Sequence, residues 1–419
     1  MRPDTHFYQK QETLYVESIP VETLIREYGS PLYVYSAAAF REQAQHYLNA
    51  IDSRPGKVCF AVKACSNLFV LRTLASLGLG MDIVSGGELF RCQKAGIAGE
   101  HIVFSGVGKS AEEIQEALTY GIHSFNVESR AELHSIHHVA QNLNLKARIS
   151  FRYNPDVDPQ THPYISTGLR DDKFGLPENE LMDALSDLKD LPHLELSGLS
   201  IHIGSQILTL APLKEAFEKL REMLDRVERL QQTRLSFLDL GGGVGVSYRK
   251  DENALNIQDY INSAYDIFGD RYTLYFEPGR SIAANSGALL TQVLYTKQSG
   301  TRHFVIVDTA MTDLIRPALY ESYHEILAPP LPNQSLGPVD VVGPVCESGD
   351  FLALARELPR NIPNGTPLMI LSAGAYGFSM SSNYNSRPRC AEVWVDGKNH
   401  TLIRARETYS DLIRGEKHI

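Results

Sequence analysis

The chain has 419 residues, of which 43% are hydrophobic and 21% are charged, the composition of a globular protein with a packed core. Fifty acidic residues outweigh 40 Lys and Arg, so the formal net charge is −10. This balance argues against nucleic acids and anionic membranes as partners, because phosphate-rich surfaces are bound by basic ones. We therefore expect a small-molecule ligand.

Two further features bear on the compartment. No run of uncharged apolar residues is long enough to span a membrane, and the N-terminal segment lacks the apolar stretch of an export signal. The cysteines are odd in number and scattered, which is typical of a reducing compartment. They are Cys59, Cys65, Cys92, Cys346 and Cys390. We expect a soluble cytoplasmic protein.

From Val58 onward, short β-branched or aromatic runs alternate with amphipathic stretches of helical length, which is typical of βα units and a parallel sheet. Eight strands are predicted, at Val58–Val62, Met81–Val84, His101–Phe104, His123–Val127, Ala147–Arg152, Leu196–Ile203, Phe237–Leu240 and Thr273–Phe276. Eight parallel strands favour a closed (β/α)8 TIM barrel, a fold of roughly 250 residues.

Beyond Arg280 the pattern changes to alternating strands that read as a separate all-β domain, a β-barrel or sandwich. These strands are predicted at Ala288–Tyr295, Phe304–Asp308, Ala391–Val395 and Thr401–Ala405. The early strand Thr13–Val16 is too short to fold alone, so we expect it to join the C-terminal sheet. The predicted domains are a barrel over residues 36–280 and a β domain over residues 1–35 and 281–419.

One connection breaks the βα rhythm. Asn154 to Gly175, after the fifth strand, is a polar segment far longer than the 2–6 residues usual for such connections. Long loops in compact domains are often lids or binding loops, so this segment is a candidate for substrate gating. A surface insertion without a role would explain it equally well.

Three motifs suggest functions that their context does not support. The run Gly241–Gly245 follows a strand, but Val246 stands where a dinucleotide-binding fingerprint needs a glycine. Gly108–Ser110 resembles the end of a P-loop, yet Val103 occupies the position of its first glycine. His134, His137 and His138 share a helix face, which we interpret as solvated rather than metal-binding. No metal is predicted.

Polar residues gather instead at the carboxyl ends of the barrel strands, where such barrels form their active sites. They are Lys63, Asp82, Arg152, the His202–Ser205 segment, Asp239 with the glycines that follow it, and the Glu277–Arg280 turn. A lysine, a histidine, a glutamate and two glycine-rich loops on one face are difficult to assign to packing.

These residue types suit one cofactor. A desolvated lysine amine such as Lys63 is a Schiff-base nucleophile, although a surface lysine would fit its position equally well. Glycines after the seventh and eighth strands let backbone N–H groups approach a phosphate. Together they imply pyridoxal 5′-phosphate (PLP), with Glu277 facing the pyridine nitrogen and His202 lying on the ring. Alone, His202 would be read as a core histidine.

Six motifs then occur in the order seen in the alanine-racemase-fold PLP-dependent decarboxylases, which the chain resembles over nearly its whole length. They are Phe60–Ala64, His202–Gln206, Leu240–Gly243, Glu277–Arg280, Cys346–Asp350 and Gly374–Gly377. Within that group, Asn154–Val157, His162–Gly168 and Cys346-Glu347 resemble the diaminopimelate decarboxylases. The usual Asn after Ala64 is Cys65 here, which is not a reacting position in that family.

The resemblance implies catalytic roles for Lys63, which would hold PLP, for His202, and for Cys346, which would donate a proton from the partner subunit of a homodimer with shared sites. It implies cofactor contacts from Lys63, Asp82, His202, Ser205, Gly242, Gly243, Glu277, Gly279, Arg280 and Tyr376. It implies substrate contacts from Arg280, Arg316, Tyr320, Glu347 and Tyr376, with Glu347 reading the distal amino group.

The implied reaction is decarboxylation of meso-2,6-diaminopimelate to L-lysine and CO2, the last step of bacterial lysine biosynthesis. Alternatives of the same fold act on ornithine, arginine, a D-amino acid or carboxynorspermidine. A racemase would need a tyrosine base where Cys346 stands. A non-catalytic PLP-binding homologue is a different class, and such proteins tend to lose the reacting residues.

Overall fold

The computed structural model describes residues 6–159, 172–331 and 334–417. The chain divides into two compact units. One comprises residues 43–246 and 253–281, and the other comprises residues 1–42, 247–252 and 282–419. We call the first the barrel unit and the second the β unit.

The barrel unit contains a closed barrel of eight parallel strands in the order β10-β11-β12-β5-β6-β7-β8-β9. The strands are β5 (Gly56–Ala61), β6 (Gly80–Ile83), β7 (Ile102–Phe104), β8 (Ser124–Val127), β9 (Ala147–Arg152), β10 (Leu194–Ser200), β11 (Phe237–Asp239) and β12 (Thr273–Phe276). Each overlaps one of the eight predicted strands, so the predicted TIM barrel is confirmed. Several predicted strands extend too far. β5 ends at Ala61, because Val62–Ala64 forms a short 3-10 helix that contains Lys63, and β10 ends at Ser200 rather than at Ile203.

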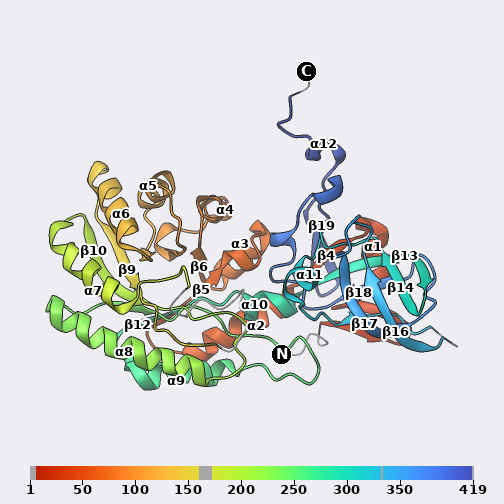
Figure 1. The fold of residues 1–419 in the computed structure, drawn as a ribbon, viewed down its shortest axis with the longest axis horizontal. Helices are drawn as coiled ribbons and strands as arrows, with labels where there is room; N and C mark the ends of the chain where they lie inside the picture. The colour runs from red at the N-terminus through yellow and green to blue at the C-terminus, as the bar shows by residue number, and fades with distance from the viewer. Residues whose placement is uncertain (1–5, 160–171, 332–333, 418–419) are drawn as a thin grey trace. The chain divides into compact units, whose positions relative to one another are not determined.

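Helices alternate with these strands and surround the barrel, as Figure 1 shows for α4 to α9. They are α2 (Ala37–Ile51), α3 (Leu68–Ser76), α4 (Gly86–Ala95), α5 (Ala111–Tyr120), α6 (Arg130–Asn142), α7 (Glu178–Asp187), α8 (Ala211–Gln231) and α9 (Ile257–Phe268). Ser85, Ser110 and Ser129 cap α4, α5 and α6, because each side chain accepts from a backbone N–H in the first turn. These caps fix where each helix leaves its strand, on the face that carries the strand-end residues.

The β unit is built on a nine-stranded sheet in the order β17-β16-β14-β13-β4-β19-β20, with β15 and β18 attached to one side. Its strands are β4 (Leu32–Ser36), β13 (Gly287–Ser299), β14 (Arg302–Val307), β15 (Ile326–Leu327), β16 (Leu336–Val342), β17 (Phe351–Pro359), β18 (Pro367–Ile370), β19 (Ala391–Asp396) and β20 (Asn399–Arg404). Its helices are α1 (Val21–Tyr28), α11 (Arg316–Tyr320) and α12 (Tyr409–Leu412), while the short α10 (Arg280–Ala283) spans the chain boundary between the units. The predicted all-β second part is confirmed.

The prediction that the early strand Thr13–Val16 joins the C-terminal sheet is wrong. Thr13–Val16 forms β2, which pairs with β1 (Phe7–Lys10) and β3 (Ile19–Pro20) in a small sheet of its own. The N-terminal strand that joins the large sheet is β4, which lies between β13 and β19. All five residues of β4 are buried, so it lacks the alternation that marks Thr13–Val16 as a strand.

The P-loop-like segment has a structural role. The Lys109 amine is buried and forms a 2.6 Å ion pair with Glu132, while the Ser110 and Glu113 side chains form the capping box of α5. Lys109 and Ser110 therefore stabilise the positions of α6 and α5. Across the part of the chain that the structure describes, no helix is long and apolar enough to cross a membrane.

Candidate active site

The Lys63 amine lies at the mouth of the barrel. Its Nζ donates to Asp82 Oδ2 over 3.0 Å, and the Asp82 side chain is fully buried while that of Lys63 is 38% exposed. Lys63 follows β5 and Asp82 lies on the neighbouring strand β6, so strand pairing sets this contact. The ion pair orients the amine and leaves it accessible to a ligand.

Two carboxyl groups lie buried side by side in the barrel. Glu277 follows β12, Asp239 ends β11, and a side-chain hydrogen bond joins them. Burial, and then the negative charges of Asp239 and Asp82, raise the pKa of Glu277 well above its ordinary value. Among the described residues, none hydrogen-bonds to Glu277 Oε1, which is buried. A buried acceptor of this kind needs a donor, which a ligand can supply.

His202 follows β10 and is held by the loop after β11. The backbone N–H of Gly242 donates to His202 Nδ1 over 3.1 Å, so Nδ1 is an acceptor and the ring proton lies on Nε2. Burial, with the positive charges of Arg152 and Lys63, lowers the pKa of His202 well below its ordinary value. His202 is therefore a neutral imidazole, whose apolar ring face suits stacking.

The glycines of this loop are required by close backbone approach. Gly241 and Gly243 have φ of +63° and +107°, a region that favours glycine. A Cβ on Gly242 would collide with the carbonyl oxygen of Glu277. The loop thus brings backbone N–H groups close to the residues after β10 and β12.

The guanidinium of Arg280 faces the loop after β10. Its Nη2 and Nε lie 2.9 and 3.2 Å from Ser205 Oγ, and Arg280 itself is buried. The preceding residue, Gly279, is also buried. A guanidinium beside a hydroxyl and a glycine turn can bind a phosphate group.

Glu128, directly after β8, fixes three neighbouring segments. It accepts from Arg152 Nη1 at 2.9 Å, from the Gly106 N–H at 2.9 Å and from the Gly175 N–H at 3.1 Å. It thereby holds the base of the long segment Asn154–Gly175. Residues 160–171, the larger part of the predicted lid, lie outside the described residues.

In the β unit, Arg316 begins α11 and is buried. Its guanidinium stacks over Tyr248 at 4.8 Å from the ring centroid, and its Nη1 lies 3.2 Å from His324 Nε2. Nη2 donates to Ser322 Oγ over 3.3 Å. These contacts hold a desolvated cation in one orientation, a suitable arrangement for a carboxylate.

Cys346 and Glu347 lie on an exposed turn of the β unit between β16 and β17. The buried Asp350 braces this turn, because its carboxylate accepts from the N–H groups of Val345 and Met311 at 2.7 and 2.6 Å. Tyr384 OH donates to Glu347 Oε2 over 3.4 Å. The turn is fixed by its base and presents its thiol to solvent.

Tyr320 ends α11, and Tyr376 has a φ of 55°, an uncommon conformation for a non-glycine residue. The following residue explains how close the backbone packs there. A Cβ on Gly377 would meet the Ala373 carbonyl oxygen and the Tyr33 hydroxyl at 2.5 Å. The backbone therefore packs tightly on Tyr33 where it presents Tyr376.

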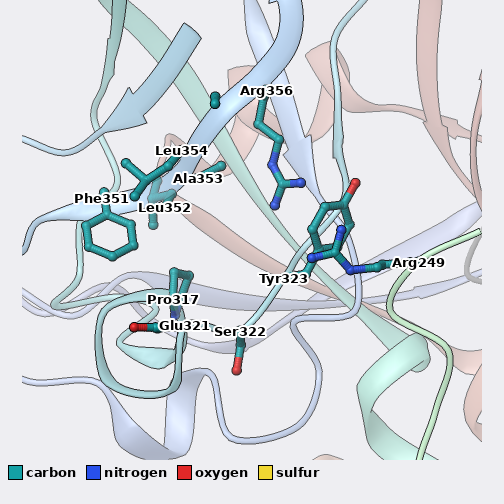
Figure 2. A pocket seen from close by; sticks show the side chains of 11 residues that line it. Arg249, Pro317, Glu321, Ser322, Tyr323, Phe351, Leu352, Ala353, Leu354 and Arg356 are labelled. Atoms are coloured by element: carbon teal, nitrogen blue, oxygen red, sulfur yellow. The ribbon is translucent and has the colours of Figure 1, made fainter. Parts of the chain in front are cut away.

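An open cavity of about 540 Å³ lies beside α11 in the β unit, and Figure 2 shows the side chains that line it. The Arg249 and Arg356 guanidinium carbons lie 4.0 and 3.5 Å from the centroid of the Tyr323 ring. Pro317, Glu321 and Ser322, which also line it, belong to α11 or follow it directly. The cavity wall supports the helix that begins with Arg316.

The barrel-unit residues suit PLP. Lys63 offers an accessible amine, Glu277 Oε1 is a buried acceptor that lacks a donor, and Arg280 with Ser205 offers a phosphate site. The structure thus brings together the predicted Lys63, Asp82, His202, Ser205, Gly242, Gly243, Glu277, Gly279 and Arg280 within the barrel unit. The predicted Arg316, Tyr320, Cys346, Glu347 and Tyr376 lie in the β unit.

Three buried residues of the site have no role in the sequence-based prediction: Asn126, Glu128 and Asp239. Asp239 and Arg152 are recognised there as strand-end residues, but without a function. The available signal was a buried-strand position with a polar residue between two apolar ones, as Asn126 lies between Phe125 and Val127.

Comparison with known proteins agrees with the site. Residues 37–284 match the family model described as pyridoxal-dependent decarboxylase, pyridoxal binding domain. The chain is 48% identical to diaminopimelate decarboxylase of Pseudomonas fluorescens, over 96% of both chains, and 47% identical to that of Pseudomonas aeruginosa, over 99% of both. The crystal structure of diaminopimelate decarboxylase from Helicobacter pylori complexed with L-lysine superposes with a TM-score of 0.89 at 43% identity, covering 94% of this chain and 98% of that one.

Identity at this level across nearly the whole length, together with the lysine, glutamate and glycine loops of the barrel, identifies the cofactor as PLP. The chain belongs to the diaminopimelate decarboxylase family of PLP-dependent enzymes.

Proposed function

We propose that the residues described above carry out decarboxylation of meso-2,6-diaminopimelate to L-lysine and CO2, the activity for which the relatives are named. The observation that carries the proposal is the pairing of an accessible Lys63 amine with a buried Glu277 acceptor in one barrel mouth. PLP, when bound, supplies an electron sink for the electron pair left on the α-carbon as the carboxylate departs.

In the barrel unit, Lys63 would bind the cofactor covalently through its amine, which Asp82 orients. Glu277 would pair with the pyridine nitrogen, and the neutral His202 would pack on the ring. Ser205, Arg280 and the Gly242–Gly243 amides would bind the phosphate, with Gly279 giving the backbone room to turn. The burial, charge and contacts of these groups support the assignments.

We assign substrate binding to Arg280 of the barrel unit and to Arg316, Tyr320 and Tyr376 of the β unit. Glu347, also of the β unit, is assigned to the distal amino group. An arginine rejects a substrate that lacks the matching carboxylate, because the desolvated guanidinium is then left without its anion. Diaminopimelate should therefore react, whereas lysine and ornithine should not.

Cys346 is assigned as the acid that protonates the α-carbon after CO2 leaves. It is the exposed member of the five cysteines, which suits a thiol offered to a second copy of the chain. We therefore propose a homodimer in which each copy supplies Cys346 and Glu347 to the site of its partner. None of the five cysteines, all of which are among the described residues, forms a disulfide, consistent with a cytoplasmic enzyme.

Substrate choice is tested by CO2 release from the PLP-loaded enzyme with meso-diaminopimelate, lysine, ornithine and arginine. A site that requires a distal polar group discriminates by about 10⁴-fold. Comparable release from ornithine or arginine would assign the chain to a related decarboxylase. Release from none of the four, with PLP bound, would favour a non-catalytic PLP-binding protein.

Sharing of sites is tested by mixing two inactive variants, Lys63→Ala and Cys346→Ala, after mild dissociation. If Cys346 comes from the partner, random reassociation restores about a quarter of the wild-type sites, because half the dimers are hybrids with one intact site each. If both residues come from one copy, mixing restores at most the residual activity of each variant.

A further inference from the structure

Asp239 is buried in the barrel, and its carboxylate is held by donors on two sides. The Gly241 N–H donates to Oδ1 over 2.9 Å, and the Asn126 side-chain amide donates to Oδ2 over 2.7 Å. Such bonds to a carboxylate favour its ionised form. Asp239 is therefore prepared to carry a negative charge away from solvent.

The orientation of Asn126 is itself fixed. Its amide nitrogen also donates to Ser105 Oγ over 3.0 Å, and its oxygen accepts from the Ser150 hydroxyl. Ser105 follows β7 and Ser150 lies on β9, so segments on both sides of β8 hold this one amide. With the oxygen occupied by Ser150, only the NH2 group can face Asp239.

Asp239 hydrogen-bonds to Glu277, so two carboxyl groups share a buried space. Two adjacent buried carboxylates cannot both be ionised at low cost, so the pair retains a proton. The donors on Asp239 assign the charge to Asp239 and the proton to Glu277. Burial raises the pKa of both carboxyl groups, but the hydrogen bonds to Asp239 oppose that rise, whereas the pKa of Glu277 is raised well above its ordinary value.

We propose that Asp239 is a positioning residue which, as an ionised carboxylate beside Glu277, keeps the pyridine nitrogen of bound PLP protonated. With PLP bound, the proton of the Glu277 carboxyl would pass to the ring nitrogen: an O–H bond would break, an N–H bond would form, and the number of protons would be unchanged. The charge on Asp239 raises the proton affinity of the Glu277–nitrogen pair as a whole, so its proton is not lost to solvent.

Other titratable groups lie near Asp239 and Glu277 and affect the pKa of these two carboxyl groups. Asp82 and Lys63 act on Glu277 with opposite signs, and the buried Cys59, Tyr260 and Tyr275 surround the two carboxyl groups. Burial raises the pKa of each of these three, so they remain neutral near neutral pH. Asp239 and Asp82 are therefore the negative charges that raise the proton affinity of Glu277.

The test is the pH dependence of the ring-nitrogen protonation, read by 15N NMR of holoenzyme loaded with 15N-labelled PLP. In Asp239→Asn the midpoint should fall by roughly one to three pH units, the usual effect of removing a nearby charge. The dissociation constant of PLP, titrated by fluorescence, should rise. Tyr260→Phe is the matched control, because the Tyr260 hydroxyl is buried near both carboxyl groups but is neutral, so its removal takes away no charge.

A double-mutant cycle shows whether Asp239 acts through Glu277. When Glu277→Gln is already present, adding Asp239→Asn should shift the midpoint far less. An unchanged midpoint in Asp239→Asn alone, or a full shift when Glu277→Gln is present, would overturn the proposal. Where Asp239→Asn does not fold, Asn126→Ala, which removes the donor to Asp239 Oδ2 and so disfavours its ionised form, should lower the midpoint in the same direction.

This inference rests on the proposed placement of PLP, but not on the choice of substrate. A protein that binds PLP and fails to release CO2 from diaminopimelate would contradict the proposed function while still giving a measurable midpoint. An unchanged midpoint in an active Asp239→Asn enzyme would contradict only the role of Asp239.

Discussion

Arg152 Nη1 lies 2.9 Å from Glu128 Oε1, and both side chains are buried in the barrel. Removing one partner of a buried ion pair leaves an uncompensated charge, which costs about 3–5 kcal/mol. Glu128→Ala should reduce the free energy of unfolding by about that amount, measured by denaturant titration of the PLP-loaded protein.

The matched control is Asp187→Ala, which breaks the Arg130–Asp187 pair on the outer helices α6 and α7. There the Arg130 side chain is 46% exposed, so solvent screens the charges and the unfolding transition should barely move. Equal losses in the two variants would show that burial of the Glu128 pair has no special cost.

Lys63→Ala should abolish covalent attachment of PLP, because Lys63 is the amine at the barrel mouth that we assign to the aldehyde. The absorption band of lysine-bound cofactor should vanish, and dialysis should remove the PLP. Lys57→Ala, near the start of β5 and so at the opposite end of that strand, should retain both. Retention of the band in Lys63→Ala would assign the attachment to a different lysine.

Cys346→Ala should lower kcat by about 10²- to 10⁴-fold, the usual contribution of a positioned general acid. Its neighbour Ser348 lies on the same exposed turn, so Ser348→Ala is the matched control and should leave kcat near that of the wild type. Product analysis sharpens the test, because protonation from solvent would scramble the stereochemistry of deuterium incorporation in Cys346→Ala.

Arg316→Lys should raise KM for diaminopimelate by about 10- to 100-fold, because a lysine cannot replace a planar guanidinium that makes charged hydrogen bonds. Arg302→Lys, whose partner Asp340 lies on the neighbouring strand β16, should not change KM. A fall in kcat at constant KM would place Arg316 in the chemical step rather than in substrate binding.

Stability should fall as the pH drops below neutrality. Burial, with the charges of Arg148 and Lys57, lowers the pKa of His123 from 6.5 to about 4, and the pKa of His202 is also lowered. Between pH 6.5 and about pH 4, the unfolded chain binds more protons than the folded chain. The free energy of unfolding therefore decreases as the pH falls through that window. Each such histidine contributes a slope of up to about 1.4 kcal/mol per pH unit.

His123→Gln should remove one histidine's share of this slope, whereas His46→Gln, at an exposed position on α2, should leave it unchanged. Denaturant titrations across the window measure both. A slope that is the same in His123→Gln and in the wild type would show that His123 is protonated in the folded state.

The barrel could be predicted from sequence because its strands are short, mostly apolar runs, and polar residues end or closely follow several of them. That pattern located Lys63, His202 and Glu277, whose residue types suggest their chemistry without a structure. The role of Asp239 could not be predicted, because it depends on contacts with Asn126 and Glu277 on strands far apart in the chain. Likewise β4 was missed, since a strand buried on both faces has no alternation.

Asn154 also has a consequence for engineering. Its N–H donates to the Leu176 carbonyl at 2.9 Å and its side-chain amide donates to the Phe174 carbonyl at 3.1 Å, while Glu128 binds the Gly175 N–H. The two ends of the intervening segment are therefore joined by the scaffold itself, so a replacement of different length adds little closure entropy. Connections of different length grafted between these two ends should therefore leave the free energy of unfolding of the barrel nearly unchanged.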